Sequence, residues 1–232
     1  MYYPNILIPA IVPSLTSLSV HQRDSLTEKV CAQLSHATRL NALDLRAVSV
    51  THPELLFKAL SKSLRNLELR LSLPIVLDTD SASNCPIPPA LTRLLITPTI
   101  VQDHRWYYHF PESLAQLELD FCETSKLSCV LPTFLPPNLL QLKVQPKPEH
   151  MHPPILDAFL RILPSSLMLL HLHPSHAHQV LPNPLLEPRL LLLFPPSLTK
   201  LCLDTTPSAN GCQIPAHLKR MKDFDNRRPH SL

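Results

Sequence analysis

The chain has 232 residues, a formal net charge of +3 and 44% apolar residues, with a single glycine, Gly211, and 27 prolines. One glycine excludes a glycine-rich phosphate loop, a dinucleotide-binding fingerprint and a nucleophile elbow, since each of these needs at least two. No apolar run approaches the 18 residues that span a bilayer, so we expect no membrane partner.

A short phrase, Leu-x-x-Leu-x-Leu, recurs along the whole sequence. Its copies start 20 to 31 residues apart, around the period of leucine-rich repeats and below that of paired-helix repeats. We call the first leucine of each copy its anchor. The anchors are Leu15, Leu40, Leu64, Leu91, Leu114, Leu139, Leu167, Leu198 and Leu218.

The spacing within the phrase predicts a strand. The second and third apolar positions are two residues apart, so they share one face of a pleated strand. A proline stands three residues before six of the anchors, where it ends the preceding segment without removing a donor from the sheet. These prolines are Pro88, Pro111, Pro136, Pro164, Pro195 and Pro215.

A single repeat cannot bury its own apolar face, whereas a stack of repeats buries these faces in a shared core. The sequence therefore predicts an α/β fold, a leucine-rich-repeat solenoid with about nine parallel strands on its concave face. Eight copies supply three apolar core positions each: 15–20, 40–45, 64–69, 91–96, 114–119, 139–144, 167–172 and 198–203. The last copy, Leu218, Met221 and Asp223, departs from this pattern at its third position.

The segments between strands predict a mixed convex side. Residues 25–36 form an expected helix, with Ser25 and Glu28 as a capping box. Helices are also expected at 52–61, capped by Thr51, and at 154–162. The other connectors are rich in proline and are expected to be extended or irregular. They cover 72–86, 98–109, 121–133, 174–192 and 204–213.

The domain prediction is one solenoid over residues 1–224, followed by a basic, disordered tail at 225–232. The last sixteen residues hold five lysines or arginines against two aspartates, which weakly favours nucleic acid; a frayed terminus explains them better, so no nucleic-acid partner is expected. Repeat one starts close to Met1 without a polar cap, so we expect either truncation or self-association through uncapped ends.

Six cysteines are present without a Cys-x-x-Cys motif, and the first 20 residues lack a basic region and are broken by prolines. They make a poor signal peptide, and the simplest interpretation is a cytoplasmic protein with reduced thiols.

The histidines of the segment 171–178 are the main candidates for metal chemistry. His171, His173, His176 and His178 could bind zinc or copper, but no cysteine or carboxylate is spaced to complete the set. A histidine-rich surface loop is the simpler interpretation. No cofactor is expected.

The outward strand positions, between the apolar ones, are the predicted binding surface. In curved repeat proteins the concave face is the usual binding face, although a solvated sheet face carries polar residues in any case. Their charge changes from acidic in repeats two to five to basic in repeats six to nine, with Arg93 as the exception. The predicted binding residues are Asn66, Glu68, Arg93, Gln116, Glu118, Gln141, Lys143, His171, Lys200 and Lys222.

The strand half of the repeat resembles a known family. Leu163-Pro164-Ser165-Ser166-Leu167 and Phe194-Pro195-Pro196-Ser197-Leu198 are similar to the FNIP-repeat branch of leucine-rich-repeat proteins. The connector half of that family usually carries Phe-Asn-x-Pro-Ile. Asn84-Cys85-Pro86-Ile87 resembles it in part but lacks the phenylalanine. The resemblance implies the solenoid fold and implies no catalytic residues.

The predicted function is therefore a non-catalytic protein–protein interaction module that binds an unknown protein through its concave face. Carboxylates are sparse and are not paired at a suggestive spacing, so no enzyme activity is expected. Two alternatives stay open: a metal-binding protein that uses the histidines of 171–178, and the substrate-recognition part of a ubiquitin-ligase adaptor. No F-box helix set precedes Leu15, so the adaptor hypothesis requires that domain elsewhere.

Overall fold

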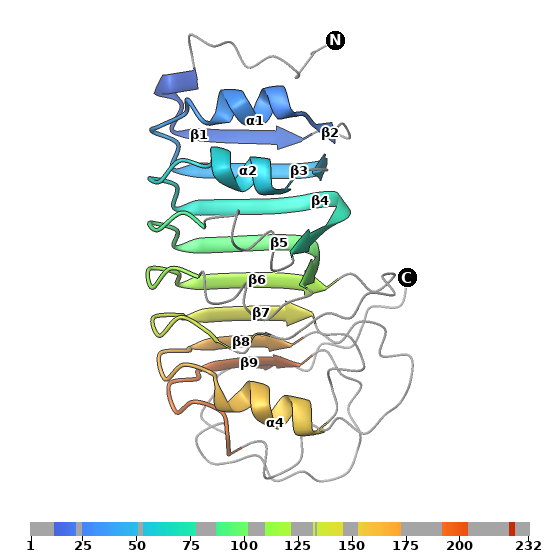
Figure 1. Cartoon of the computed structure of the whole chain (residues 1–232). Helices are drawn as coiled ribbons and strands as arrows, with labels where there is room; N and C mark the ends of the chain where they lie inside the picture. The colour runs from blue at the N-terminus through green and yellow to red at the C-terminus, as the bar shows by residue number, and fades with distance from the viewer. Residues whose placement is uncertain are drawn as a thin grey trace.

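The computed structural model describes residues 12–21, 25–50, 53–77, 87–101, 110–121, 132, 134–145, 153–172, 192–203 and 223–225. Figure 1 shows their strands stacked in chain order into one sheet, with α1 and α2 on the same side of it. The strands are β1 (Ser17–His21), β2 (Ser25–Leu26), β3 (Ala42–Val50), β4 (Asn66–Leu77), β5 (Arg93–Val101), β6 (Gln116–Phe121), β7 (Gln141–Gln145), β8 (Leu169–Leu172), β9 (Lys200–Leu203) and β10 (Asp223–Asp225).

The sheet is parallel throughout the described chain. Nine strands follow the order β1-β3-β4-β5-β6-β7-β8-β9-β10, and the two-residue β2 pairs with the far end of β3. Equivalent repeat positions stand opposite each other, for example Leu67 beside Leu94 and Leu117 beside Leu142. The prediction of about nine parallel strands with one rung per repeat is confirmed.

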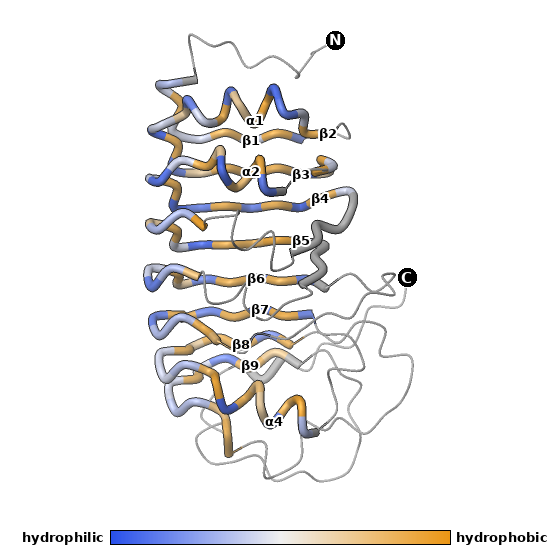
Figure 2. Tube along the Cα trace, in the orientation of Figure 1, coloured by the Kyte–Doolittle hydropathy of each residue, from blue (hydrophilic) through white to orange (hydrophobic). Residues whose placement is uncertain are grey.

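One face of the sheet builds the core. Every predicted core position from Leu40 to Leu201 is at most 3% exposed. Leu15, Leu18 and Val20 of the first repeat are partly buried and pack against the same cluster. Figure 2 shows the alternation of hydrophobic and hydrophilic residues along the strands that separates this core from the opposite face. We call that opposite face the open face.

Three helices of the described residues cover the core side, at the places predicted. They are α1 (Glu28–Leu34), α2 (Pro53–Ala59) and α4 (Pro153–Arg161). Leu34 of α1, Phe57 of α2 and Leu160 of α4 are each 1% exposed and belong to the cluster that contains the strand leucines. A short 3₁₀ turn, η1 (Val12–Ser14), precedes β1. No described helix is long and apolar enough to cross a membrane.

The predicted start of the first helix is wrong. Ser25 and Leu26 pair with Ser49 and Val50 in the sheet, so Ser25 is not the cap. The cap is Thr27, whose hydroxyl accepts a hydrogen bond from the Val30 amide at 3.4 Å. Thr27 directly precedes Glu28, the first helical residue. It is the N-cap because the pairing of β2 with β3 holds the two residues before it, Ser25 and Leu26, in an extended conformation. The other predicted cap, Thr51, lies outside the described residues.

The prolines before the strands close a turn onto the anchors. The anchor amide donates to the carbonyl oxygen three residues earlier, at 3.1 Å for Leu91 to Pro88 and 3.0 Å for Leu114 to Pro111. The same bond forms at Pro136, Pro164 and Pro195, whereas Pro215 lies outside the described residues. Proline suits this position because its carbonyl accepts while its missing N–H is not needed.

A serine ladder joins successive repeats. It consists of the serines directly before four anchors, each donating its hydroxyl hydrogen to the carbonyl oxygen of the preceding anchor at 2.7–3.2 Å. Its members are Ser63, Ser113, Ser166 and Ser197. In repeat six Asn138 stands at this position and donates to the Glu112 carbonyl at 3.1 Å. The ladder satisfies carbonyl groups that the turn leaves without a backbone partner.

The last repeat does not follow the predicted frame. β10 pairs Asp223 with Lys200 and Phe224 with Leu201, so the backbone frame is shifted by three residues. Asp223, predicted at a core position, takes the register of the first outward position, and Phe224 takes that of the second core position. The shift has a physical reason, since it gives the core position to an aromatic residue in place of a carboxylate.

Candidate functional site: the open face of the sheet

The strand register arranges the outward positions in two rows that run across the strands. Row one holds the first outward residue of each strand, and row two holds the second. Row one is Ser17, Ala42, Asn66, Arg93, Gln116, Gln141, Leu169, Lys200 and, by register, Asp223 of β10. Row two is Ser19, Asp44, Glu68, Leu95, Glu118, Lys143, His171, Cys202 and, by register, Asp225 of β10.

The structure therefore brings nine of the ten predicted binding residues to one face. Lys222 lies outside the described residues. That these side chains bind a partner stays a prediction.

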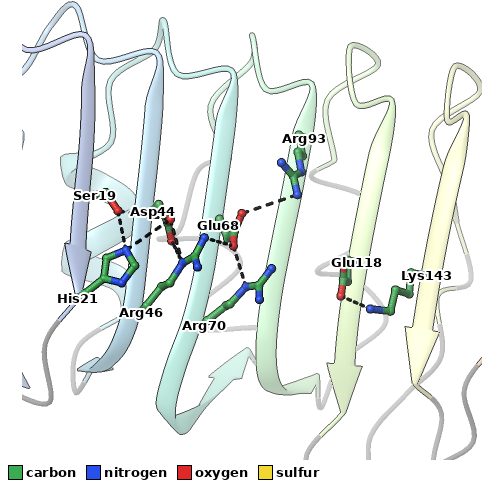
Figure 3. Close-up of polar contacts among 9 residues, drawn as sticks. All are labelled: Ser19, His21, Asp44, Arg46, Glu68, Arg70, Arg93, Glu118 and Lys143. Carbon is green, nitrogen blue, oxygen red and sulfur yellow. Dashed lines mark hydrogen bonds and ion pairs between the residues drawn. The ribbon is translucent and has the colours of Figure 1, made fainter.

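Glu68 is the centre of an arginine cluster on the open face (Figure 3). Its carboxylate, whose side chain is only 14% exposed, lies 2.7 Å from Arg70 Nε and 3.3 Å from the Arg46 guanidinium. A nitrogen of Arg93 is 3.7 Å away. Three cations therefore share one half-buried carboxylate, and this part of the face is cationic rather than acidic.

Asp44 extends this network towards the first strand. It receives Arg46 Nε at 3.0 Å and the Ser19 hydroxyl at 3.4 Å, and His21 contacts the same Ser19 oxygen at 3.0 Å. The hydrogen bond to Asp44 raises the pKa of the Arg46 guanidinium above its usual value. The positive charge at Arg46 is therefore permanent in the physiological range.

Arg46 and Arg70 are charged residues of the open face that the sequence analysis missed. Both stand six residues after an anchor, one outward position beyond the two that were considered, and they pair with each other in register. The predicted change from acidic to basic is wrong for repeats two to four, because these two arginines and Arg93 surround Asp44 and Glu68. β3 and β4 continue well past the Leu-x-x-Leu-x-Leu phrase. Extending the alternation of outward residues by one further position in these two repeats would have identified both arginines.

A shallow hollow of about 120 Å³ lies on the open face across β5 to β8. Arg93, Gln116, Gln141 and Leu169 of row one line it, together with Leu95, Glu118 and Lys143 of row two. Leu95 is only 1% exposed although it points away from the core, so the longer side chains around it shield it from water. Glu118 accepts a hydrogen bond from Lys143 Nζ at 2.6 Å, so the two opposite charges offset each other.

Towards the C-terminal end of the sheet, the two rows continue through β8 and β9 to Asp223 and Asp225 of β10. Lys200 stands beside Leu169 in row one, and His171 stands beside Cys202 in row two. Of the histidines proposed for metal binding, His171 is on the open face, whereas His173, His176 and His178 lie outside the described residues. Within the described part of the chain, no three histidine, cysteine or acidic side chains gather around a common point. Metal binding stays a prediction.

The repeats, the parallel register and the continuous leucine core decide the architecture. The fold is a leucine-rich-repeat solenoid. No protein-family model matches the chain, and no curated protein matches it. Among solved structures, eight chains match the solenoid.

One of the matching structures is the crystal structure of an internalin (inlF) from Listeria monocytogenes str. 4b F2365. It shares 15% sequence identity with this solenoid, at a TM-score of 0.44, over 87% of this chain. The solenoid spans 65% of that internalin's length, which is less than two thirds.

Proposed function

We propose that this chain is a non-catalytic protein-interaction module that binds another protein through the open face of its solenoid. The observation that carries the proposal is the hollow across β5 to β8, whose lining combines charged and amide side chains with leucines. A mixture of apolar area and polar groups is the usual composition of a protein-binding surface.

The carboxylates of the open face argue against catalysis there. Glu68 and Asp44 are held by arginines, and Glu118 is held by Lys143 at 2.6 Å. Each of these carboxylates is engaged by a cation, and none of them is paired with a second carboxylate as an acid–base team would be. A binding role needs no proton transfer.

We also propose a cytoplasmic location and a relation to FNIP-type repeats. The buried Cys31 thiol is free, which suits a reducing compartment. The serine in the family-like phrase Leu163-Pro164-Ser165-Ser166-Leu167 has a structural role here, since Ser166 closes the ladder onto Leu139. The same role would explain why the phrase contains serine at that position.

Reversal of charge on the open face tests the proposal. The double variant Lys143→Glu, Lys200→Glu should lose a partner that the wild-type chain captures from its native cells, and purified partner should bind the variant more weakly. The matched control is Lys29→Glu, Lys58→Glu, which makes the same charge change on the exposed sides of α1 and α2. Equal partner binding by both double variants would disprove binding through the open face.

A further inference from the structure

Row one has a one-sided charge between β5 and β9. Its five residues there are Arg93, Gln116, Gln141, Leu169 and Lys200, which are two cations, two amides and one leucine without a carboxylate. The nearest carboxylate of row two towards this end, Glu118, is already bound to Lys143. Between β5 and β9 the row therefore carries two positive charges and no negative one. On β10 the row continues to Asp223, which pairs in register with Lys200.

Arg93 has donors left for a ligand. Its closest nitrogen is 3.7 Å from Glu68, beyond hydrogen-bond distance, and its side chain is 47% exposed. Glu68 already binds Arg70 at 2.7 Å and Arg46 at 3.3 Å, so it does not need Arg93. A guanidinium with unused N–H groups is well suited to a bidentate carboxylate. At the β9 end of this stretch, no described residue forms an ion pair with Lys200.

The apolar part of the row lies next to Lys200. Leu169 stands beside Lys200 in register and is half-buried in the wall of the hollow. An aliphatic side chain of a ligand placed here would contact Leu169 between polar neighbours, and such buried apolar contacts supply much of the energy of binding.

We propose that row one binds an extended, acidic peptide segment of a partner protein, with one carboxylate at Arg93, an aliphatic side chain at Leu169 and a second carboxylate at Lys200. This inference rests on the proposed function and names the chemistry of the partner. The two glutamines stand between the charged ends, where their amides can donate to and accept from the peptide backbone.

The strand spacing sets the pattern of that segment. Arg93 and Leu169 are three strands apart, or roughly 14 Å, and Lys200 is one strand further, at roughly 19 Å. An extended chain rises about 3.3 Å per residue. The aliphatic residue therefore stands about four positions after the first acidic residue, and the second acidic residue stands about six positions after the first. Both intervals are even, so all three side chains point to the same side of the peptide.

A nucleic-acid strand is the competing occupant, since phosphates also pair with arginine and lysine. Single-stranded nucleic acids are held by cationic grooves that carry aromatic platforms for the bases. Row one has leucine and glutamine where such a platform would stand, which favours a peptide.

Selection from a phage-displayed library of random twelve-residue peptides tests the inference. The targets are the full wild-type chain, the variant Arg93→Gln, Lys200→Glu, and the control Lys29→Glu, Lys58→Glu, each checked for an unchanged thermal unfolding midpoint. Wild type and control should enrich peptides with two acids about six positions apart and an aliphatic residue between them. A synthetic peptide of the enriched sequence should bind the first variant about tenfold more weakly or worse, and its wild-type affinity should fall with added salt.

The other outcomes separate the two proposals. Enriched peptides without acids that are lost on the variant Gln116→Arg, Gln141→Arg would overturn the acidic occupant and leave binding through the open face standing. Selection that yields no peptide sensitive to any open-face variant would overturn both. If a single-stranded DNA oligonucleotide binds tightly and loses affinity on Arg93→Gln, Lys200→Glu while no peptide does, the occupant is a nucleic acid and the inference is wrong.

Discussion

Ser166 donates its hydroxyl hydrogen to the carbonyl oxygen of Leu139 at 2.8 Å and lies 2.6 Å from the Pro137 carbonyl oxygen. One short side chain of repeat seven thus serves two backbone acceptors of repeat six, at the point where the chain turns into the strand. The same geometry recurs at Ser113, which reaches the Leu91 and Pro89 carbonyls at 2.8 and 2.9 Å. The repeats are therefore joined along the turn edge as well as through the core.

We predict that Ser166→Ala lowers the free energy of unfolding by about 1–3 kcal/mol, because it leaves the half-buried Leu139 carbonyl without its partner. Urea denaturation followed by circular dichroism measures the change. The control is Ser165→Ala in the same turn, where the side chain is exposed and a change within about 0.5 kcal/mol is expected. Equal effects of the two substitutions would show that the ladder adds nothing to stability.

The two leucines that flank Gln141 in repeat six should respond differently to truncation. Leu142 is fully buried in the core, whereas Leu140 is 41% exposed. Leu142→Ala should cost about 2–5 kcal/mol of unfolding free energy, because it removes transfer energy and leaves a cavity. Leu140→Ala should cost less than about 1 kcal/mol in the same denaturation assay. A small loss at Leu142 would contradict the shared core on which the solenoid depends.

Ala47 marks a bulge in β3 whose backbone favours glycine. Its φ is +56°, and the register with β4 shifts between Arg46 and Val48. Since alanine in the left-handed region costs roughly 1–2 kcal/mol, Ala47→Gly should raise the unfolding free energy by up to about 1 kcal/mol. The same substitution at Ala42, which pairs regularly in that strand, should lower it by about 0.5–1 kcal/mol. Thermal unfolding of both variants gives the comparison, and destabilisation by Ala47→Gly would refute the strained bulge.

The arginine cluster around Glu68 predicts a salt-dependent loss of stability. Glu68→Gln leaves Arg46, Arg70 and Arg93 facing one another without their shared carboxylate. We expect a loss of about 1–3 kcal/mol at low salt that shrinks at high salt, since screening weakens the repulsion. Asp157→Asn removes an exposed ion pair with Arg161 on α4 and should change stability by less than about 0.5 kcal/mol. A loss at Glu68 that does not depend on salt would point to the hydrogen bonds alone.

The core of this fold was predictable because the same apolar positions recur in successive repeats. A buried position that is leucine in eight successive strands is insensitive to errors at any one of them. The three helices were predictable for a similar reason, since each carries an apolar stripe such as Leu156, Phe159 and Leu160 of α4. Where the repetition weakens, as in the last copy, the frame was wrong by three residues and only the pairing of Phe224 with Leu201 corrects it.

The open face was harder to predict because its charges interact across strands. In the sequence, Glu68 and Arg46 are 22 residues apart, and only the strand register brings them to 3.3 Å. The prediction of the start of α1 was wrong for a similar reason. Serine is a good N-cap residue, but Ser25 pairs with Ser49 in the sheet. Local sequence patterns therefore predict the core positions that recur in every repeat. They miss contacts that depend on which residues the strand register brings together.

Cys31 gives a prediction that depends on pH. Its side chain is 5% exposed, and burial, with the nearby carboxylates of Glu28 and Glu54, raises the pKa of the thiol from 9.0 to about 11. At about pH 8 the thiolate fraction is then about a hundredfold lower than for a thiol with the usual pKa. Alkylation by iodoacetamide should therefore be at least about a hundredfold slower at Cys31 in the folded chain than in the urea-unfolded chain, as followed by peptide mass spectrometry.

The same shift sets a direction for stability at high pH. The folded chain holds the Cys31 proton more tightly than the unfolded chain does, so this contribution is complete below about pH 9 and is lost as the pH rises towards about 11. The unfolding free energy of the wild type should therefore fall more steeply over this range than that of Cys31→Ala, whatever the cost of the substitution itself at neutral pH. Parallel curves for the two proteins, or rapid alkylation of Cys31 in the folded state, would mean that the thiol is not buried against the core as the contacts of α1 require.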